Sequence, residues 1–181
     1  MRFSAVPMIY FKAMVLDRTM KLEEWFPIAG SLGIDGTEIH DRSLASFDPP
    51  YLDFIMAELH KNRLRVSQLV GAADFTHPDP AVRMGELEIT KRNIDAAARL
   101  GATCVRLTAG QVHPSVSREQ GVAWACEYLK ASADYALERK VWVAYEDHYK
   151  DYFWERPDFS QRGEVFLEIS IVGVLTVCPQ E

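Results

Sequence analysis

Ionisable side chains follow four successive segments of the sequence that are typical of β-strands. They are Glu38 and His40 at the end of the second segment, Asp74 after the third, Arg106 in the fourth, and Glu146-Asp147-His148 at the end of the fifth. In parallel α/β proteins, functional groups gather where strands run into their following loops. The residue types and their positions therefore predict a polar active site at the carboxyl ends of the strands.

Two of these strand ends carry a carboxylate and an imidazole two residues apart. Successive side chains of a strand point to opposite faces, so Glu146 shares a face with His148, and Glu38 shares a face with His40. A carboxylate beside an imidazole can bind a divalent cation such as manganese, cobalt, magnesium or zinc. The same pair can act as a general acid and base. Spacing also leaves open a third interpretation, in which both pairs only make surface hydrogen bonds.

Arg106 has two interpretations of its own. Its guanidinium can hold a phosphate or a hydroxyl group of a substrate, because it carries several hydrogen-bond donors. It can equally pair with Glu38 across neighbouring strands. The sequence leaves both interpretations open.

Alternating strand-like and helix-like segments must position these groups. The predicted strands cover residues 3–9, 36–40, 65–70, 102–107 and 141–145. The first predicted helix covers residues 20–32 and is interrupted at Pro27. The second begins at Asp48-Pro49-Pro50, and the third runs from Asp79-Pro80 to Gly101. The fourth runs from the capping box of Ser117 and Gln120 to Lys140, and the fifth covers residues 159–169. This alternation implies parallel strands with right-handed crossovers. No linker divides the chain, so we expect a single domain over residues 1–181.

The turn after the first predicted strand favours a closed barrel over an open sheet. Open doubly wound sheets often carry a glycine-rich phosphate loop at this place. Residues 10–18 contain no glycine at all. This absence favours a closed barrel of parallel strands.

Composition restricts the partners and the compartment. The net charge is −6 and the pI is about 5.4, which argues against a basic face for nucleic acid. No apolar run approaches the ~20 residues of a membrane span, and the N-terminus lacks the apolar core of a signal peptide. The three cysteines match neither a disulfide framework nor a zinc motif. We expect a cytoplasmic protein without a nucleic-acid or membrane partner.

Two motifs stand out in the first half of the chain. They are the run Gly33-Ile34-Asp35-Gly36-Thr37-Glu38-Ile39-His40, and Asp74-Phe75 followed by Pro78-Asp79. The first resembles the second strand, and the second the third loop, of the sugar phosphate isomerase/epimerase family, which has a xylose isomerase-like TIM barrel.

The resemblance continues into the second half. Residues 94–102, followed by Val105-Arg106-Leu107 and Ala109-Gly110, are similar to the third helix and fourth strand of the family. Glu146-Asp147-His148 resembles its Glu-Asn-His ending of the fifth strand and departs from it at Asp147. Together the motifs cover most of residues 1–169.

The resemblance implies a metal-dependent reaction on a small sugar or hydroxy-ketone. In such enzymes a divalent cation (manganese, cobalt, magnesium or zinc) binds the substrate carbonyl and its neighbouring hydroxyl and acidifies the α-proton. A carboxylate removes that proton to give an enediolate, and a proton returns elsewhere or on the opposite face. By this analogy Glu146 is a metal ligand and a candidate base, His148 is a substrate contact beside it, and Arg106, Glu38 and His40 line the substrate cup.

Length is the main difficulty for this interpretation. The predicted strands start roughly 35 residues apart, so eight units would need ~280 residues. The family expects an Asp ligand on the sixth strand, a His after it and a Glu on the eighth, whereas after Glu168 the only acidic residue is Glu181. The resemblance therefore implies an α/β fold of the (β/α)8 TIM-barrel type with about the first five to six strand–helix units present, in a truncated chain that keeps one of four metal ligands. Its open sheet edge favours a homo-oligomer.

Three functions compete at this stage. The leading one is a metal-dependent sugar isomerase or epimerase. A metal-dependent endonuclease shares the same barrel type, but the acidic charge and the missing basic patch count against it. The third is a non-catalytic fragment that serves in binding or assembly.

Overall fold

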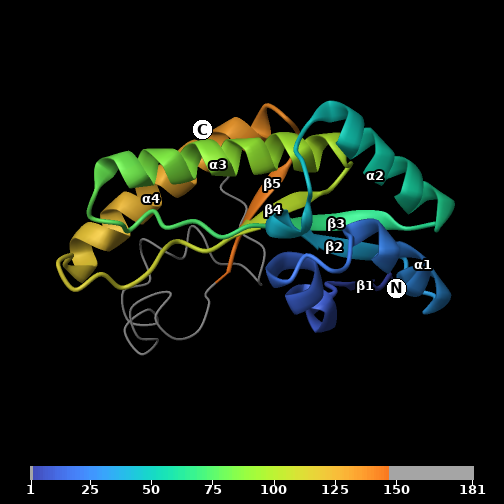
Figure 1. Ribbon diagram of the computed structural model, residues 1–181. Coiled ribbons are helices and arrows are strands. Elements are labelled where there is room, and N and C mark those ends of the chain that lie inside the picture. Colours follow the sequence, from blue (N-terminus) through green and yellow to red (C-terminus); the bar gives the residue numbers. More distant parts are fainter. Residues whose placement is uncertain (1, 147–181) are drawn as a thin grey trace. The chain divides into compact units, whose positions relative to one another are not determined.

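The computed structural model describes residues 2–146 of the chain (Figure 1). The described strands are β1 (Ser4–Ala5), β2 (Gly36–His40), β3 (Arg65–Val70), β4 (Cys104–Leu107) and β5 (Trp142–Tyr145). The α-helices are α1 (Trp25–Ser31), α2 (Pro49–Lys61), α3 (Pro80–Arg99) and α4 (Arg118–Leu137). One helix therefore follows each of the first four strands. His148 and the predicted helix at 159–169 lie outside the described residues.

The strands form one sheet in the order β1-β2-β3-β4-β5. The pairs β1–β2 and β2–β3 are parallel, with Ser4 opposite Gly36 and His40 opposite Val70. Consecutive parallel strands need a crossover, and the intervening helices provide it. The predicted α/β class, with parallel strands that alternate with helices, is confirmed.

The chain divides into two compact units, and β4 begins in the first and ends in the second. The first unit contains Met1–Gly71 and Arg92–Val105. Its core consists of apolar side chains that are almost completely removed from solvent, namely Leu22, Phe26, Ile39, Ile55, Leu59, Leu64, Leu69 and Ile94. These residues come from α1, β2, α2, β3 and α3 and from the segments beside them. Burial of such side chains is the main force that holds these elements together.

The second unit contains Ala72–Lys91 and the residues from Arg106 onward. In its described part, Phe75 and Leu107 are fully buried, as is Ala125 of α4. The ring of Phe75 stacks on Tyr128 of α4, with centroids 5.4 Å apart and an interplanar angle of 14°. This stacking attaches the loop after β3 to α4 by an offset aromatic contact.

The first predicted strand and helix differ most from the structure. The predicted strand at 3–9 is reduced to Ser4–Ala5, and a 3₁₀ turn follows at Met8–Tyr10. Pro7 has no N–H to donate to a neighbouring strand, so the ladder ends before it. The predicted helix at 20–32 is a 3₁₀ turn at Leu22–Glu24 followed by α1. Pro27 lies in the first turn of α1, where its missing N–H costs no intrahelical bond.

The other helix ends follow the predicted signals. Ser117 accepts a hydrogen bond from the backbone N–H of Gln120 at 3.2 Å, which forms the N-cap of α4. Asp48 directly precedes α2, and Pro49 is the first residue of the helix. The side chain of Asp48 makes no capping hydrogen bond. Gly101 ends the α3 segment with φ +67°, a conformation that a side chain would strain.

Candidate functional site

Arg106 and Glu146 form the best-defined charged pair at a strand end of the second unit. The guanidinium Nε of Arg106 contacts Oε2 of Glu146, the residue directly behind β5. The backbone N–H of Glu146 also donates to the carbonyl of Leu107 at 2.9 Å, so the residue is tied to β4. The Arg106 side chain is 17% exposed and that of Glu146 is 44% exposed. The pair is therefore a carboxylate held from one side by a guanidinium and accessible to a small molecule from the solvent side.

Arg106 has a partner that neither interpretation of the sequence named. The structure pairs Arg106 with Glu146. Within the first unit, Oε2 of Glu38 accepts a hydrogen bond from Nε2 of Gln68 at 2.7 Å. Substrate binding by Arg106 and its pairing with Glu38 both stay predictions.

Glu38 and His40 lie on the same face of β2 in the first unit. Along β2, Glu38 and His40 are partly exposed, whereas Thr37 before Glu38 and Ile39 between the two are buried. This is the alternation that a strand with one buried face requires. Burial raises the pKa of the nearby Cys104 thiol, and the negative charge of Glu38 adds to the effect.

His40 takes part in a buried network. Its Nδ1 lies 2.9 Å from Oδ1 of Asp41, and Nδ2 of Asn93 donates to Oδ2 of Asp41 at 2.9 Å. Burial raises the pKa of Asp41, but hydrogen bonds from His40 and Asn93 outweigh burial and hold this pKa below its usual value. Asn93 is 1% exposed. These contacts join the end of β2 to α3 through the Asp41 carboxylate and engage Nδ1 of His40.

A second imidazole–carboxylate pair lies in the loops after β3 and β4, in the second unit. Nε2 of His113 lies 2.9 Å from Oδ2 and 3.2 Å from Oδ1 of Asp74. The ring of His77 meets that of His113 edge-on, with centroids 5.0 Å apart. Both members of the pair are partly exposed, at 20% for His113 and 15% for Asp74. A carboxylate that orients an imidazole is an arrangement suited to proton transfer.

Thr76 and Gly110 hold these two loops together. The Thr76 hydroxyl lies 2.9 Å from Oδ1 of Asp74 and 2.6 Å from the carbonyl of Gln111, and it accepts the Gln111 N–H at 2.8 Å. Gly110 has φ +150°, and a Cβ at this position would lie 2.2 Å from Oγ1 of Thr76. Only glycine allows so close an approach of the backbone. The Ala109-Gly110 motif thus has a physical role in placing His113.

Sequence reasoning identified Asp74 as a strand-end group but missed His113 and His77. Both histidines follow strands at the carboxyl end, as the identified residues do, but they lie several residues further into the loops. A search for imidazoles over the whole β3 and β4 loops would have found them. Their pairing across 39 residues is visible only after folding.

The described residues do not form a metal centre. Within residues 2–146, no group of three or more histidine, cysteine, aspartate or glutamate side chains could hold a metal ion. Glu146 is the one expected metal ligand in this range, and Arg106 contacts its carboxylate. A divalent cation needs several oxygen or nitrogen donors, so the described donor set does not fit a bound cation. His148, the predicted neighbour of Glu146, lies beyond the described range.

The lengths and hydropathies of the helices bear on whether the described part of the chain could cross a membrane. Neither of the two 20-residue helices α3 and α4, nor any other helix in the described residues, is long and apolar enough to cross a membrane.

Comparison with known proteins assigns the fold. A family model described as a xylose isomerase-like TIM barrel matches residues 26–170. Among the curated proteins, none matches the chain at a significant level.

Solved structures with the same fold include two sugar epimerases. D-psicose 3-epimerase with D-tagatose from Clostridium cellulolyticum H10 is 13% identical, with a TM-score of 0.66, and the match covers 79% of this chain and 51% of that one. The 3-keto-D-glucoside 4-epimerase YcjR from E. coli is 17% identical with a TM-score of 0.66, over 81% of this chain and 58% of that one.

A third similar structure contains a metal. The IOLI protein with a bound zinc atom is 17% identical with a TM-score of 0.64, and the match covers 80% of this chain and 51% of that one. These identities establish a shared fold. The chain spans little more than half the length of the three structures.

Proposed function

Because the chain belongs to the xylose isomerase-like TIM barrel family, we propose that it carries part of a sugar isomerase or epimerase site. The substrate is a small keto-sugar or hydroxy-ketone, and the reaction is a proton transfer beside its carbonyl. The fold that the chain shares with two sugar epimerases supports this substrate class. The Arg106–Glu146 pair at a strand end is the observation that carries the proposal.

Glu146 is the base in this proposal. One carboxylate oxygen takes the proton from the carbon next to the substrate carbonyl, and the C–H electron pair forms a carbon–carbon double bond while the carbonyl oxygen becomes an enolate. Delivery of a proton to the former carbonyl carbon, with transfer of the α-hydroxyl proton to the enolate oxygen, moves the carbonyl and isomerises the sugar. Delivery of a proton to the opposite face of the same α-carbon, as the carbonyl re-forms, epimerises it. Arg106 acts as a positioning residue, because its contact with one oxygen fixes the carboxylate while the exposed part of Glu146 faces solvent.

His113 is the second proton carrier that we assign. Epimerisation needs a group that delivers a proton to the face opposite the base, and an imidazole suits this task near neutral pH. Asp74 orients the His113 ring through its two oxygens. Glu38 and His40 are proposed substrate contacts from the second strand, and His148 is proposed as a substrate contact beside Glu146.

A divalent cation belongs to the family-level expectation. A bound zinc atom in a structure of the same fold supports this expectation for the family. Manganese, cobalt, magnesium and zinc are the candidates, and Glu146 is the proposed ligand. Since the described donors do not fit a bound cation, no step of the proposed proton transfer is routed through one.

Exchange of substrate hydrogen with solvent tests the proposal. The full chain is incubated in D2O with D-psicose, D-tagatose, D-fructose and dihydroxyacetone, with and without each of the four cations, and incorporation of deuterium next to the carbonyl is followed by NMR. We expect exchange that falls at least about 100-fold in Glu146→Gln, because a general base contributes 10²–10⁴-fold to the rate.

The matched control is Glu127→Gln on the exposed surface of α4, which makes the same chemical change and leaves exchange unchanged. Absence of exchange with every ketose and cation contradicts the proposal and favours a non-catalytic chain. Cleavage of abasic-site DNA by the same preparation would instead favour the endonuclease alternative.

A further inference from the structure

A cavity of 470 Å³ opens at the amino-terminal ends of the strands in the first unit. Its walls come from residues that precede or begin β1, β2 and β3 and from the segment before β4. The residues of the proposed function lie in the later part of a strand or follow it, whereas the residues that line this cavity precede or begin a strand. On β2, for example, Gly36 lines the cavity from the first position of the strand, and His40 occupies the last.

Positive charge dominates the lining. Arg2, Arg63 and Arg65 line the cavity, and Asp35 is its one acidic residue. Within the described part of the chain, no ion pair involves any of the three guanidinium groups, although each is close enough to line the same space. The carboxylate of Asp35 already accepts the backbone N–H of Phe3 at 2.8 Å. A local excess of two positive charges thus occurs on a protein of net charge −6.

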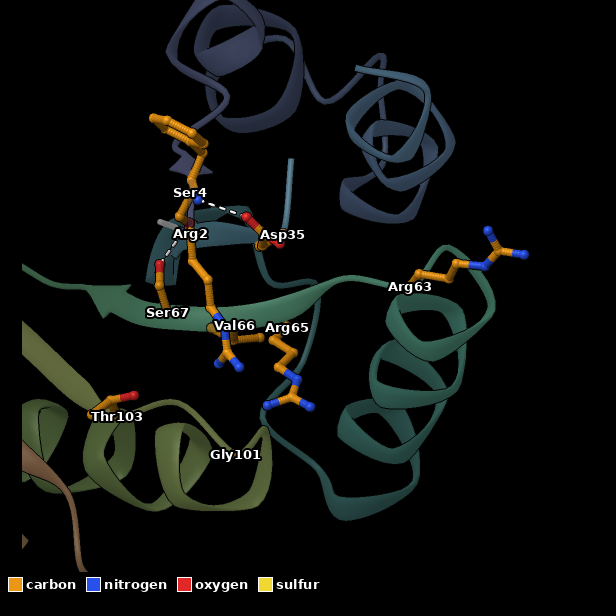
Figure 2. Close-up of a pocket in the computed structure, with 11 residues that line it drawn as sticks. Arg2, Ser4, Asp35, Arg63, Arg65, Val66, Ser67, Gly101 and Thr103 are labelled. Atoms are coloured by element: carbon orange, nitrogen blue, oxygen red, sulfur yellow. Dashed lines mark hydrogen bonds between the residues drawn. The ribbon is translucent and has the colours of Figure 1, made fainter. Parts of the chain in front are cut away.

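Two of the arginines are directed toward the same space. Figure 2 shows the side chain of Arg2 running across β3 beside Val66 and ending, like the side chain of Arg65, on the side of the strand that faces Gly101. The guanidinium of Arg63 extends away from them. Like charges repel each other, and an anion between Arg2 and Arg65 would remove that repulsion.

Hydroxyl groups add neutral donors to the same wall. Ser4 and Ser67 are joined by a hydrogen bond of 2.7 Å between their Oγ atoms. Thr103 lines the cavity from the segment before β4. Guanidinium groups with nearby hydroxyls are the donor set that tetrahedral oxyanions accept, because several N–H and O–H groups can address separate oxygens.

We propose that this cavity binds a phosphate or sulfate group, either as the free ion or as part of a small metabolite. Arg2 and Arg65 contact the oxyanion directly, Thr103 donates from its hydroxyl, and Arg63 adds only long-range attraction. The site takes a ligand and performs no chemistry on it. It is independent of the proposed proton transfer.

Titration calorimetry of the full chain with inorganic phosphate at low ionic strength tests the site. We expect saturable binding that weakens at least about tenfold in Arg65→Gln and in Arg2→Gln, because each variant loses a charge-assisted hydrogen bond. Arg63→Gln weakens it less than about threefold, since only a screened charge is lost. Lys61→Gln removes one positive charge from the same unit outside the cavity and is the matched control, with unchanged affinity.

Further measurements identify the source of the bound phosphate group and distinguish this site from the proposed sugar site. Tighter binding of glucose 6-phosphate than of phosphate, with no binding of glucose, indicates a phosphorylated metabolite. Equal affinities indicate the free ion. Glu146→Gln must leave phosphate affinity unchanged, so loss of sugar exchange and loss of phosphate binding are distinguishable. Absence of saturable phosphate and sulfate binding overturns the site, as does equal affinity of the wild type and Arg65→Gln. The three arginines are exposed, so their variants are expected to fold, which circular dichroism checks.

Discussion

Two imidazole–carboxylate pairs lie at or after strand ends in residues 2–146, and their surroundings differ. In the first unit, Asp41 is 8% exposed and accepts hydrogen bonds from buried Asn93 and from neighbouring backbone as well as from His40. In the second unit, Asp74 and His113 meet between two loops and remain partly exposed. The same two residue types thus occur once in a buried network and once within reach of solvent.

The different surroundings suit the two pairs to different roles, one in the stability of the fold and one in proton transfer. A buried carboxylate with several donors holds elements together, and its protonation or removal leaves those donors without partners. A carboxylate that orients one accessible imidazole is better placed to influence proton transfer, and its loss costs less stability. Of the two pairs, we therefore assign a role in the proposed reaction to Asp74 and His113.

Gly110→Ala is expected to have the largest effect on this comparison. The new Cβ would lie 2.2 Å from Oγ1 of Thr76, at a backbone φ of +150° that disfavours side chains. Strain and overlap together should lower the free energy of unfolding by about 4 kcal/mol. Urea unfolding measures the loss, and NMR should show displaced His113 signals with those of His40 unchanged.

The matched control for this variant is Gly85→Ala in α3. A Cβ at Gly85 would meet nothing within 4 Å, and a helical alanine should add up to about 1 kcal/mol of stability. Equal stabilities of Gly110→Ala and the wild type would mean that the two loops do not approach each other closely.

Removing each of the two carboxylates in turn tests this comparison directly. Asp41→Ala leaves the Nδ2 of Asn93 buried without its acceptor and should cost about 3 kcal/mol of unfolding free energy. Asp74→Ala should cost about 1 kcal/mol, because the partly exposed His113 can bind water and the buried Thr76 hydroxyl keeps the carbonyl of Gln111 as its acceptor. Urea denaturation of both variants decides the order. A larger loss in Asp74→Ala would reverse the assignment of structural and chemical roles.

Lowering the pH is expected to have the smallest effect on the free energy of unfolding. The pKa of Asp41 lies below its usual value of 3.8 in the folded chain. A carboxyl with a lowered folded pKa contributes stability above its unfolded pKa and loses this contribution as the pH falls through the folded pKa. The stability gap between wild type and Asp41→Asn should therefore be full at pH about 6 and shrink below pH about 4. Urea unfolding across this range measures the gap, and a gap independent of pH would contradict the lowered pKa.

Local signals predicted most of the described elements. The proline and capping signals around Asp48 and Ser117 placed the starts of α2 and α4, and the strand-like segments at residues 36–40 and 65–70 coincide with β2 and β3. Prediction failed at the first strand, because two residues of pairing carry too little pattern and Pro7 stops the ladder. Alternation along β2 correctly predicted that Glu38 and His40 share a face.

Site contacts were harder to predict than elements. Spacing placed Arg106 and Glu146 at strand ends but named only Glu38 as a protein partner of Arg106 and did not choose Glu146. Such a choice depends on register and on side-chain rotamers, which short-range patterns do not specify. His113 was missed for the same reason, since its partner lies 39 residues away.

The sequence by itself determined the alternation of strands and helices, the acidic balance of the chain and the strand ends at which ionisable groups gather. These properties follow from local periodicity, capping and composition, which act within a few residues. Only the tertiary structure decided that Arg106 meets Glu146, that Asp74 orients His113, and that Arg2 and Arg65 line one cavity. These contacts join residues that are far apart in the chain, and burial of a shared core is what brings them together.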